Sequence, residues 1–166
     1  MIRSEVEADV PIIRSIHETA FPSPAEADLV DRLRESGRLA ISLVAEVQKQ
    51  VIGHIALSPV TLDPEVAKIR GVGIGPVAVL PDHRGKGIAG NLIQRSVTLC
   101  REAGFNFLVV LGDPEYYRCF GFRPASPQGL GNEFGAAETF MAIELNFGAL
   151  SSCKSTVRYA EEFAGV

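Results

Sequence analysis

Residues 77–90 read VAVLPDHRGKGIAG and give the strongest indication of the fold. The apolar residues before the glycines predict a strand, and the apolar spacing after them predicts a helix of about four turns. The first N–H groups of a helix have no intrahelical partner and carry partial positive charge, and glycines let the backbone approach an oxyanion closely. Arg84 and Lys86 add two full positive charges. The helix dipole disfavours cations at a helix N-terminus that is simply solvated. The turn is therefore predicted to bind an anion such as a phosphate.

Gly85, Gly87 and Gly90 also match the spacing of a dinucleotide-binding loop. Such a loop occupies the first strand–helix turn of a βαβ unit, with an acidic residue about 20 positions further on. Here a long stretch of helix and hairpin comes first, and the acid at the next strand end, Asp113, lies beyond that distance. Only one crossover follows. The order of elements therefore disfavours a dinucleotide site, and no Walker pattern is present.

Hydrophobic spacing and stop signals predict the elements around this turn. Asp9 is the expected N-cap of a first helix, which Phe21-Pro22 stops. Residues 23–26 predict a capping box at the start of a second helix, with proline at its first helical position, and Gly37 ends that helix. The other expected elements are strands over 39–47 and 51–62 joined by the turn 48–50, a helix from 88 ended by Gly104, a strand over 105–111, a short helix over 115–120 and a strand over 140–147.

The apolar run over 72–80 contains Gly73, Gly75 and Pro76. These residues favour irregular pairing or an exposed edge over a regular central strand. The order of elements predicts a mixed α/β sheet in one domain over 1–166, with a core over 1–150 and a C-terminal tail over 151–166.

The chain has 166 residues, 46% of them hydrophobic and 22% charged, with a net charge of −4. These values are ordinary for a globular domain and exclude disordered, collagen-like and coiled-coil chains. No basic run or aromatic–basic pattern suggests nucleic acid as a partner. The three cysteines form no C-x-x-C pair, and the sequence contains neither a signal peptide nor a membrane-spanning apolar run. We therefore expect a reduced, cytoplasmic protein with no membrane partner.

Two motifs resemble those of the GNAT superfamily of N-acetyltransferases. The acyl-CoA-binding pattern Arg/Gln-x-x-Gly-x-Gly/Ala is present as Arg84-x-x-Gly87-x-Ala89. The second signature, aromatic-Tyr-x-x-x-Gly-Phe, is present at residues 116–122 as YYRCFGF. One helix and one strand separate the two motifs, as in the family. Residues 112–117 and the late strand segment 140–145 resemble the corresponding segments of a bacterial branch of predicted acetyltransferases.

The resemblance implies an α/β (α+β) fold with a mixed, mostly antiparallel sheet, splayed central strands and flanking helices. It implies acetyl-CoA as cosubstrate, with strand amides along the pantetheine and the Val79 amide polarising the thioester carbonyl. Tyr117 would protonate the departing thiolate, and its alternative role is packing against the pantetheine. No metal is expected. The residues implied to bind the cofactor are Val77, Ala78, Val79, Arg84, Gly85, Lys86, Gly87, Ile88 and Ala89.

The general base stays open at this point, with His54, Asp113, Glu133, Glu138 and water as candidates. A lysine-like amine is almost fully protonated at neutral pH and needs a positioned base, whereas an α-amine needs only a path through water. His54 lies in a strand-like run, where a structural histidine is the alternative. Asp113 precedes a proline and also fits a helix start. The family often carries an asparagine before its tyrosine, and this chain has Asp113 in a shorter segment.

The resemblance places the acceptor at the loop 21–25 and the segment 126–139. The acceptor would be a small-molecule or peptide amine, which the net negative charge would help to attract. A homodimer is compatible with the family. The alternative in another class is a non-catalytic acyl-CoA binder or sensor that keeps the cofactor site without turnover.

Overall fold

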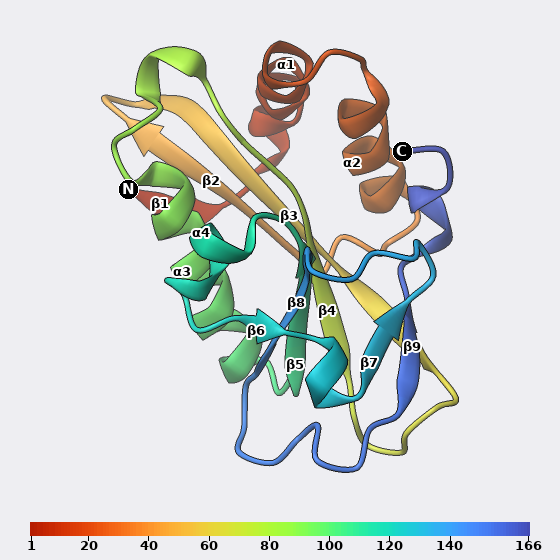
Figure 1. Ribbon diagram of the computed structural model, residues 1–166. Helices are drawn as coiled ribbons and strands as arrows, with labels where there is room; N and C mark the ends of the chain where they lie inside the picture. The colour runs from red at the N-terminus through yellow and green to blue at the C-terminus, as the bar shows by residue number, and fades with distance from the viewer. The chain divides into compact units, whose positions relative to one another are not determined.

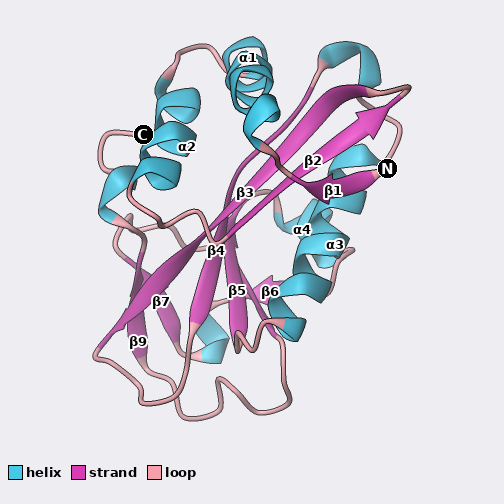
Figure 2. Cartoon of the chain, turned by 180° about the vertical axis from the view of Figure 1, so that it is seen from behind, coloured by secondary structure: helices cyan, strands magenta, loops and turns pink.

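Four α-helices and nine β-strands form the chain, and the computed structural model describes residues 1–166 (Figures 1 and 2). The helices are α1 (Val10–Ala20), α2 (Ala25–Glu35), α3 (Ile88–Glu102) and α4 (Pro114–Arg118). The strands are β1 (Ile2–Ser4), β2 (Ile41–Val47), β3 (Gln50–Asp63), β4 (Gly71–Val79), β5 (Phe107–Leu111), β6 (Arg123–Pro124), β7 (Leu130–Asn132), β8 (Phe140–Glu144) and β9 (Ser155–Arg158).

The chain divides into two units. Unit 1 comprises Met1–Ser58, Gly75–Ser96 and Glu161–Val166, and unit 2 comprises Pro59–Ile74 and Val97–Ala160. The elements β3, β4 and α3 each contribute residues to both units.

Unit 1 arranges its strands in the order β1, β2, β3 and β4, with β1–β2 and β2–β3 antiparallel. The β2–β3 turn uses Gln48 and Lys49, which have φ values of 49° and 64°, as a two-residue hairpin turn requires. Gln50, expected in the turn, is the first residue of β3. Helices α1 and α2 lie side by side (Figures 1 and 2). Apolar residues of both helices pack with those of the strands in one core cluster: Ile13, Ile16, Val30, Val44, Val51, Ala56 and Ala78.

Two helix starts differ from the predicted capping. Asp9 occupies the N-cap position of α1 without a side-chain cap bond, and its carboxylate instead accepts the Val6 N–H at 2.8 Å and pairs with Arg3 at 2.7 Å. Pro24 is the N-cap of α2 rather than its first helical residue, and no capping box forms. The prediction was wrong here because ion pairing at the start of α1 competes for the carboxylate that the local pattern assigns to the cap.

Unit 2 is built around β5, which pairs in parallel with β4 and antiparallel with β8. β6 adds to β8, while β9 joins β3 antiparallel and β7 in parallel. Residues Phe107 to Val110 of β5 are buried, as the continuous apolar run predicts for a central strand. Antiparallel pairs outnumber parallel ones, so the prediction of a mixed, mostly antiparallel sheet is confirmed.

The exposed-edge interpretation of residues 72–80 is wrong, because β4 lies between β3 and β5 in the strand order. The expected irregular pairing is present. The ladder to β5 joins Gly71–Ile74 to Phe107–Val110 and precedes Gly75, whose φ is 149°, and Pro76, which has no N–H to donate. Burial on both faces of the strand therefore outweighs the glycine and proline signals.

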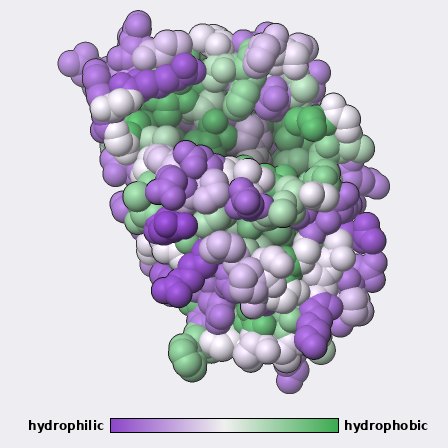
Figure 3. Space-filling view, viewed as in Figure 1, coloured by the Kyte–Doolittle hydropathy of each residue, from purple (hydrophilic) through white to green (hydrophobic).

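The remaining boundaries shift by a few residues. β8 ends at Glu144, before the predicted end at residue 147, and α4 covers 114–118 rather than 115–120. No helix has the length and apolar character needed to cross a membrane. On the face in Figure 3, hydrophilic residues surround smaller apolar patches, an arrangement that is ordinary for protein surfaces.

Candidate active site

The turn between β4 and α3 has the geometry of an anion-binding loop. A short 3-10 helix, Pro81–His83, leads into an exposed stretch, in which Gly85 and Gly87 adopt φ values of 75° and 79°. A Cβ atom at either glycine would meet nothing within 4 Å, so the backbone conformation rather than crowding calls for glycine. The Arg84 Nε–H donates to the Val79 carbonyl at 2.9 Å, which ties the loop to the end of β4.

Helix α3 follows directly, so its free N–H groups and its dipole are directed at the exposed loop. Arg84 and Lys86 are both exposed and supply the full positive charges. Val77, Ala78 and Val79 form the end of β4 in the same unit, with Ala78 and Val79 buried. Ile88 and Ala89, the first residues of α3, are half-buried. The predicted cofactor residues are thus consecutive parts of one strand–loop–helix segment.

Unit 1 also contains a buried pair of histidines. His17 in the last turn of α1 and His54 on β3 both have 0% exposure, and His17 Nε2 lies 2.8 Å from His54 Nδ1. His54 Nε2 lies 2.7 Å from the Ser42 hydroxyl on β2. Burial lowers the pKa of His17 to about 4 and the pKa of His54 well below its ordinary value. Both rings are therefore neutral at pH 7.

Two buried polar atoms at the loop between α1 and α2 have no hydrogen-bond partner: His17 Nδ1 and Glu26 Oε2. Phe21, at the start of that loop, stacks on the His17 ring with centroids 6.0 Å apart and an 8° angle between the planes. Phe21 also packs against the core cluster that contains Ala78 of β4. The two helix ends that flank the loop 21–25, which is predicted to take part in acceptor binding, thus each carry one unsatisfied polar atom.

Tyr117 belongs to unit 2 and lies on α4, in a cluster of aromatic rings from α4 and the residues that follow it. Its ring contacts those of Tyr116, Phe120 and Phe122 at centroid distances of 5.3, 6.4 and 5.6 Å. Burial, reinforced by Tyr116, raises the pKa of Tyr117 to about 12. A Cβ atom at Gly112 would lie 2.3 Å from the Tyr117 ring, so only glycine leaves room for it. The phenol is held protonated and can donate a hydrogen bond.

The other candidate bases have different surroundings. Asp113 is the N-cap of α4, and its carboxylate accepts the Glu115 N–H at 3.1 Å. Glu133 accepts the Tyr159 N–H at 3.1 Å and lies 3.6 Å from Arg158. Glu138 is exposed. Asp113 and Glu133 thus have structural partners, whereas His54 belongs to the buried pair.

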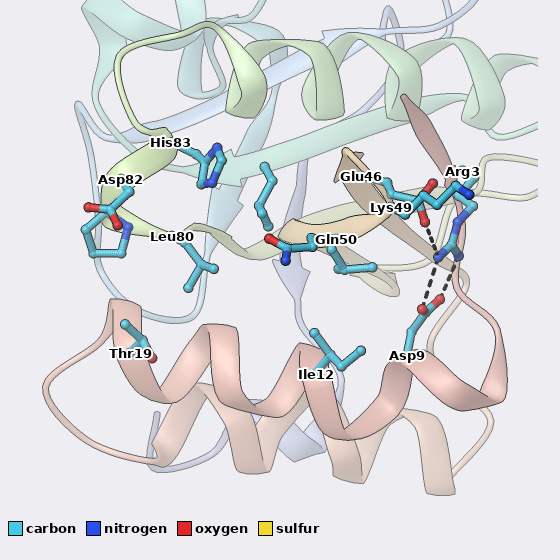
Figure 4. Close-up of a pocket in the computed structure, with 13 residues that line it drawn as sticks. Arg3, Asp9, Ile12, Thr19, Glu46, Lys49, Gln50, Leu80, Asp82 and His83 are labelled. Atoms are coloured by element: carbon cyan, nitrogen blue, oxygen red, sulfur yellow. Dashed lines mark hydrogen bonds and ion pairs between the residues drawn. The ribbon is translucent and has the colours of Figure 1, made fainter.

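A separate cavity of about 770 Å³ lies in unit 1 between α1, the β2–β3 turn and Pro81–His83 (Figure 4). One end is closed by ion pairs from Arg3 to Asp9 and Glu46, at 2.7 and 3.2 Å. Asp82 and His83 line the other end, next to the glycine-rich loop 84–87. The charged groups at the Arg3 end satisfy one another.

Comparison with known proteins gives the family. The acetyltransferase (GNAT) domain family matches residues 1–125. The chain belongs to the GNAT acetyltransferases. It is 38% identical to the uncharacterized N-acetyltransferase YhbS of Escherichia coli K12 over 165 residues, 98% of each chain. It is also 34% identical to the uncharacterized N-acetyltransferase YjhQ of the same organism over 122 residues, 72% of this chain and 67% of YjhQ.

Two solved GNAT structures resemble this acetyltransferase closely. The crystal structure of E. coli YhbS in complex with CoA has a TM-score of 0.92 at 38% identity, covering 98% of this chain and 91% of that one. A GNAT acetyltransferase from Brucella melitensis in complex with acetyl-CoA has a TM-score of 0.81 at 34% identity, covering 98% and 97%. The predicted GNAT fold and acyltransferase class are confirmed.

Sequence patterns did not single out His17, Ser42 and Glu5 in this GNAT acetyltransferase. His17 lies on the buried stripe of an amphipathic helix, where the pattern indicates only a core position. No local motif links His17 to Ser42 on β2 or to Glu5 in the segment before α1. The available signal was two histidines on core-facing positions of neighbouring elements, which predicts burial but not contact.

Proposed function

We propose that this GNAT acetyltransferase transfers an acetyl group from acetyl-CoA to a primary amine by direct attack on the thioester. The acyl donor is supported by the exposed loop 84–87 at the start of a 15-residue helix and by relatives crystallised with CoA or acetyl-CoA. In this proposal, the loop binds the pyrophosphate, and the amides of Val77–Val79 line the pantetheine. The Val79 N–H stabilises the oxyanion, a contribution of ~10²–10³ in rate for such donors.

The observation that carries the acceptor half is the pair of unsatisfied atoms at the α1–α2 loop. Glu26 Oε2 is a carboxylate oxygen and can only accept a hydrogen bond. The lone pair of a neutral imidazole nitrogen at His17 accepts as well. An ammonium or amine group carries several N–H donors and can donate to either atom. An alcohol or carboxylate acceptor offers one donor or none, so a primary amine fits best.

Tyr117 is proposed to donate a hydrogen bond to the departing sulfur. A thiol resembling free cysteine has a pKa of about 8.5, well below the pKa of about 12 of the buried phenol. Complete proton transfer to the thiolate is therefore uphill, and the hydrogen bond acts mainly while charge develops in the transition state. This role predicts a rate effect without a binding effect.

The test combines ligand binding with turnover. Thermal unfolding with acetyl-CoA, CoA and NAD should show a shift with the two CoA species alone, since a ligand at 100 times its Kd stabilises by about 2.7 kcal/mol. A panel of primary amines, including polyamines, amino sugars and peptides with free N-termini, is then incubated with acetyl-CoA, and free CoA is measured.

Tyr117→Phe separates a catalyst from a sensor. A catalyst should lose about 10-fold to 10²-fold in kcat while its affinity for acetyl-CoA stays within twofold. Binding of CoA species without acetylation of any amine would favour the non-catalytic sensor. No thermal shift with any CoA species would refute both functions.

A further inference from the structure

Four polar side chains from separate parts of unit 1 form a continuous hydrogen-bonded chain. It runs from His17 to His54 at 2.8 Å and from His54 to Ser42 at 2.7 Å. The Ser42 hydroxyl then donates to Glu5. Arg34 of α2 closes the chain with two hydrogen bonds to the Glu5 carboxylate, at 2.8 and 3.0 Å. The chain runs from the last turn of α1, where Phe21 of the following loop stacks on His17, to a half-buried carboxylate.

The Glu5–Arg34 ion pair fixes the direction of every hydrogen bond in this chain. Burial raises the pKa of Glu5, but hydrogen bonds from Arg34 and Ser42 outweigh it and hold that pKa below its ordinary value. Glu5 is thus ionised and can only accept, so Ser42 must donate to it. The Ser42 oxygen is then free to accept from His54, which must carry its hydrogen on Nε2.

The same logic continues to the end of the chain. His54 with its hydrogen on Nε2 has a lone pair on Nδ1, so His17 must donate from its own Nε2. His17 is neutral, because burial lowers its pKa to about 4. Its Nδ1 therefore carries a bare lone pair, and this is the buried atom that lacks a partner. A structural histidine satisfies both nitrogens when buried, as His54 does.

We propose that His17 Nδ1 is the general base for the acceptor amine and that His54, Ser42 and Glu5 relay the proton away from it. The inference rests on the proposed function, which supplies the amine. When the amine nitrogen attacks the thioester carbon, it becomes positively charged and gives a proton to His17 Nδ1. His17 passes its Nε2 proton to His54 Nδ1, His54 passes its Nε2 proton to Ser42, and Ser42 passes its own to Glu5.

The relay leaves both histidines neutral before and after the step. Only their tautomers change, and one proton has moved from the amine to the Glu5 carboxylate. No buried imidazolium accumulates, which burial of both rings would penalise. When the product leaves, the chain runs backwards, and His17 Nδ1 returns the proton to water. His17 is the catalytic residue of this step, and the other three act through it.

The charged groups that face the pair come from every neighbouring element. Asp31 and Arg34 of α2 act on His17 with opposite signs. Arg34 and Asp9 act on His54 with opposite signs, and Glu5 Oε1 lies 3.9 Å from His54 Nε2. The charged groups around the relay are therefore one cation, Arg34, and several carboxylates. Glu5, the carboxylate that receives the proton, is the one paired with Arg34.

Nitrogen NMR of the whole protein, labelled with ¹⁵N-histidine, tests the hydrogen-bond direction without any acceptor. At pH 7, both His17 and His54 should show a protonated Nε2 and a bare Nδ1. A protonated Nδ1 on His17, or a charged ring, would overturn the proposal. Assignment uses His17→Gln and His54→Gln, which each remove one set of signals.

Kinetics with the fastest amine of the panel then test the base. His17→Gln should lower kcat/KM about 10²-fold at pH 7, and the deficit should shrink as pH rises, because hydroxide then removes the proton from the attacking nitrogen. Ser42→Ala removes only the relay hydroxyl and should cost about 10-fold with the same pH trend. Ser58→Ala, which removes another serine hydroxyl of unit 1, buried on β3, is the matched control and should change nothing.

Two outcomes would contradict the relay. One is a Ser42→Ala variant that behaves like Ser58→Ala. The other is a deficit in His17→Gln that is constant with pH, which indicates a structural role. If no amine is acetylated, the proposed acceptor is refuted, and hydrolysis of acetyl-CoA becomes the test reaction, since water must then lose its proton to the same base. A hydrolysis rate that both variants leave unchanged would also overturn the relay.

Discussion

His17 in unit 1 and Tyr117 in unit 2 experience the same physical effect with opposite chemical results. Burial disfavours the charged form of each side chain, which lowers the pKa of His17 to about 4 and raises the pKa of Tyr117 to about 12. The neutral form of histidine is a proton acceptor, whereas the neutral form of tyrosine is a proton donor. Desolvation thus keeps His17 in its proton-accepting form and Tyr117 in its proton-donating form, while it makes the first a weaker base and the second a weaker acid.

The two regions differ in how the side chain is positioned. His17 is held by a directed chain of hydrogen bonds from β3 and β2, so its tautomer is set as well as its place. Tyr117 is held by ring packing on a five-residue helix, which fixes its position without directing its hydroxyl. A base needs a defined lone pair, while a phenol can rotate its O–H toward the forming charge.

The largest expected effect is on stability at low pH and tests the histidine region. The unfolded state binds a proton at His17 near pH 6.5, and the folded state does so only near pH 4. Stability is therefore full above pH 6.5 and is lost as pH falls toward 4, by about 3 kcal/mol from this residue. Urea unfolding at several pH values measures the slope.

His17→Gln should flatten that slope between pH 6.5 and 4. His54, whose pKa is also lowered, keeps a contribution of the same sign. Glu5 and Asp9, whose pKa values lie below the ordinary range, add their loss at still lower pH. An unchanged slope in the variant would show that His17 is not buried as a neutral ring.

The next effect is on rate and tests the tyrosine region. In Gly112→Ala the added Cβ would lie 2.3 Å from the Tyr117 ring, so the ring must move. We expect kcat to fall about 30-fold, or ~2 kcal/mol in the activation barrier, with affinity for acetyl-CoA retained. Steady-state kinetics and ligand titration separate the two quantities.

The control for Gly112→Ala is the same change in a Tyr117→Phe background. Without the hydroxyl, a displaced ring has little left to lose, so the added alanine should cost less than threefold. Equal losses in both backgrounds would show that the alanine acts elsewhere, and the positioning role of Gly112 would be abandoned.

The smallest effect concerns the cap of α4. Asp113→Ala removes the hydrogen bond to the Glu115 N–H and should reduce the free energy of unfolding by about 1 kcal/mol. The exposed Glu138→Ala change serves as the stability control and should have no measurable effect. An equal loss of stability in both variants would show that the Asp113 cap does not help to position Tyr117.

Much of the fold could be predicted from local patterns. The helix after the glycines, the buried strand Phe107–Val110 and the two motifs all depend on neighbouring residues, which set backbone conformation and burial. The central position of β4 could not be predicted, because Gly75 and Pro76 are typical of an edge strand. Packing between β3 and β5 outweighs that local preference. The cap of α1 failed for a similar reason, since Arg3 engages Asp9.

The glycine-rich turn, the aromatic segment with Tyr117 and the acetyltransferase family could all be recognised without coordinates, because each depends on a short run of adjacent residues. The polar residues of the proposed relay could be identified only from the folded chain. Glu5, His17, Ser42 and His54 are dispersed over the first third of the chain and meet only when α1 packs on the sheet. The direction of their hydrogen bonds depends on the Arg34–Glu5 ion pair, a contact between α2 and the segment before α1 that no spacing in the sequence encodes.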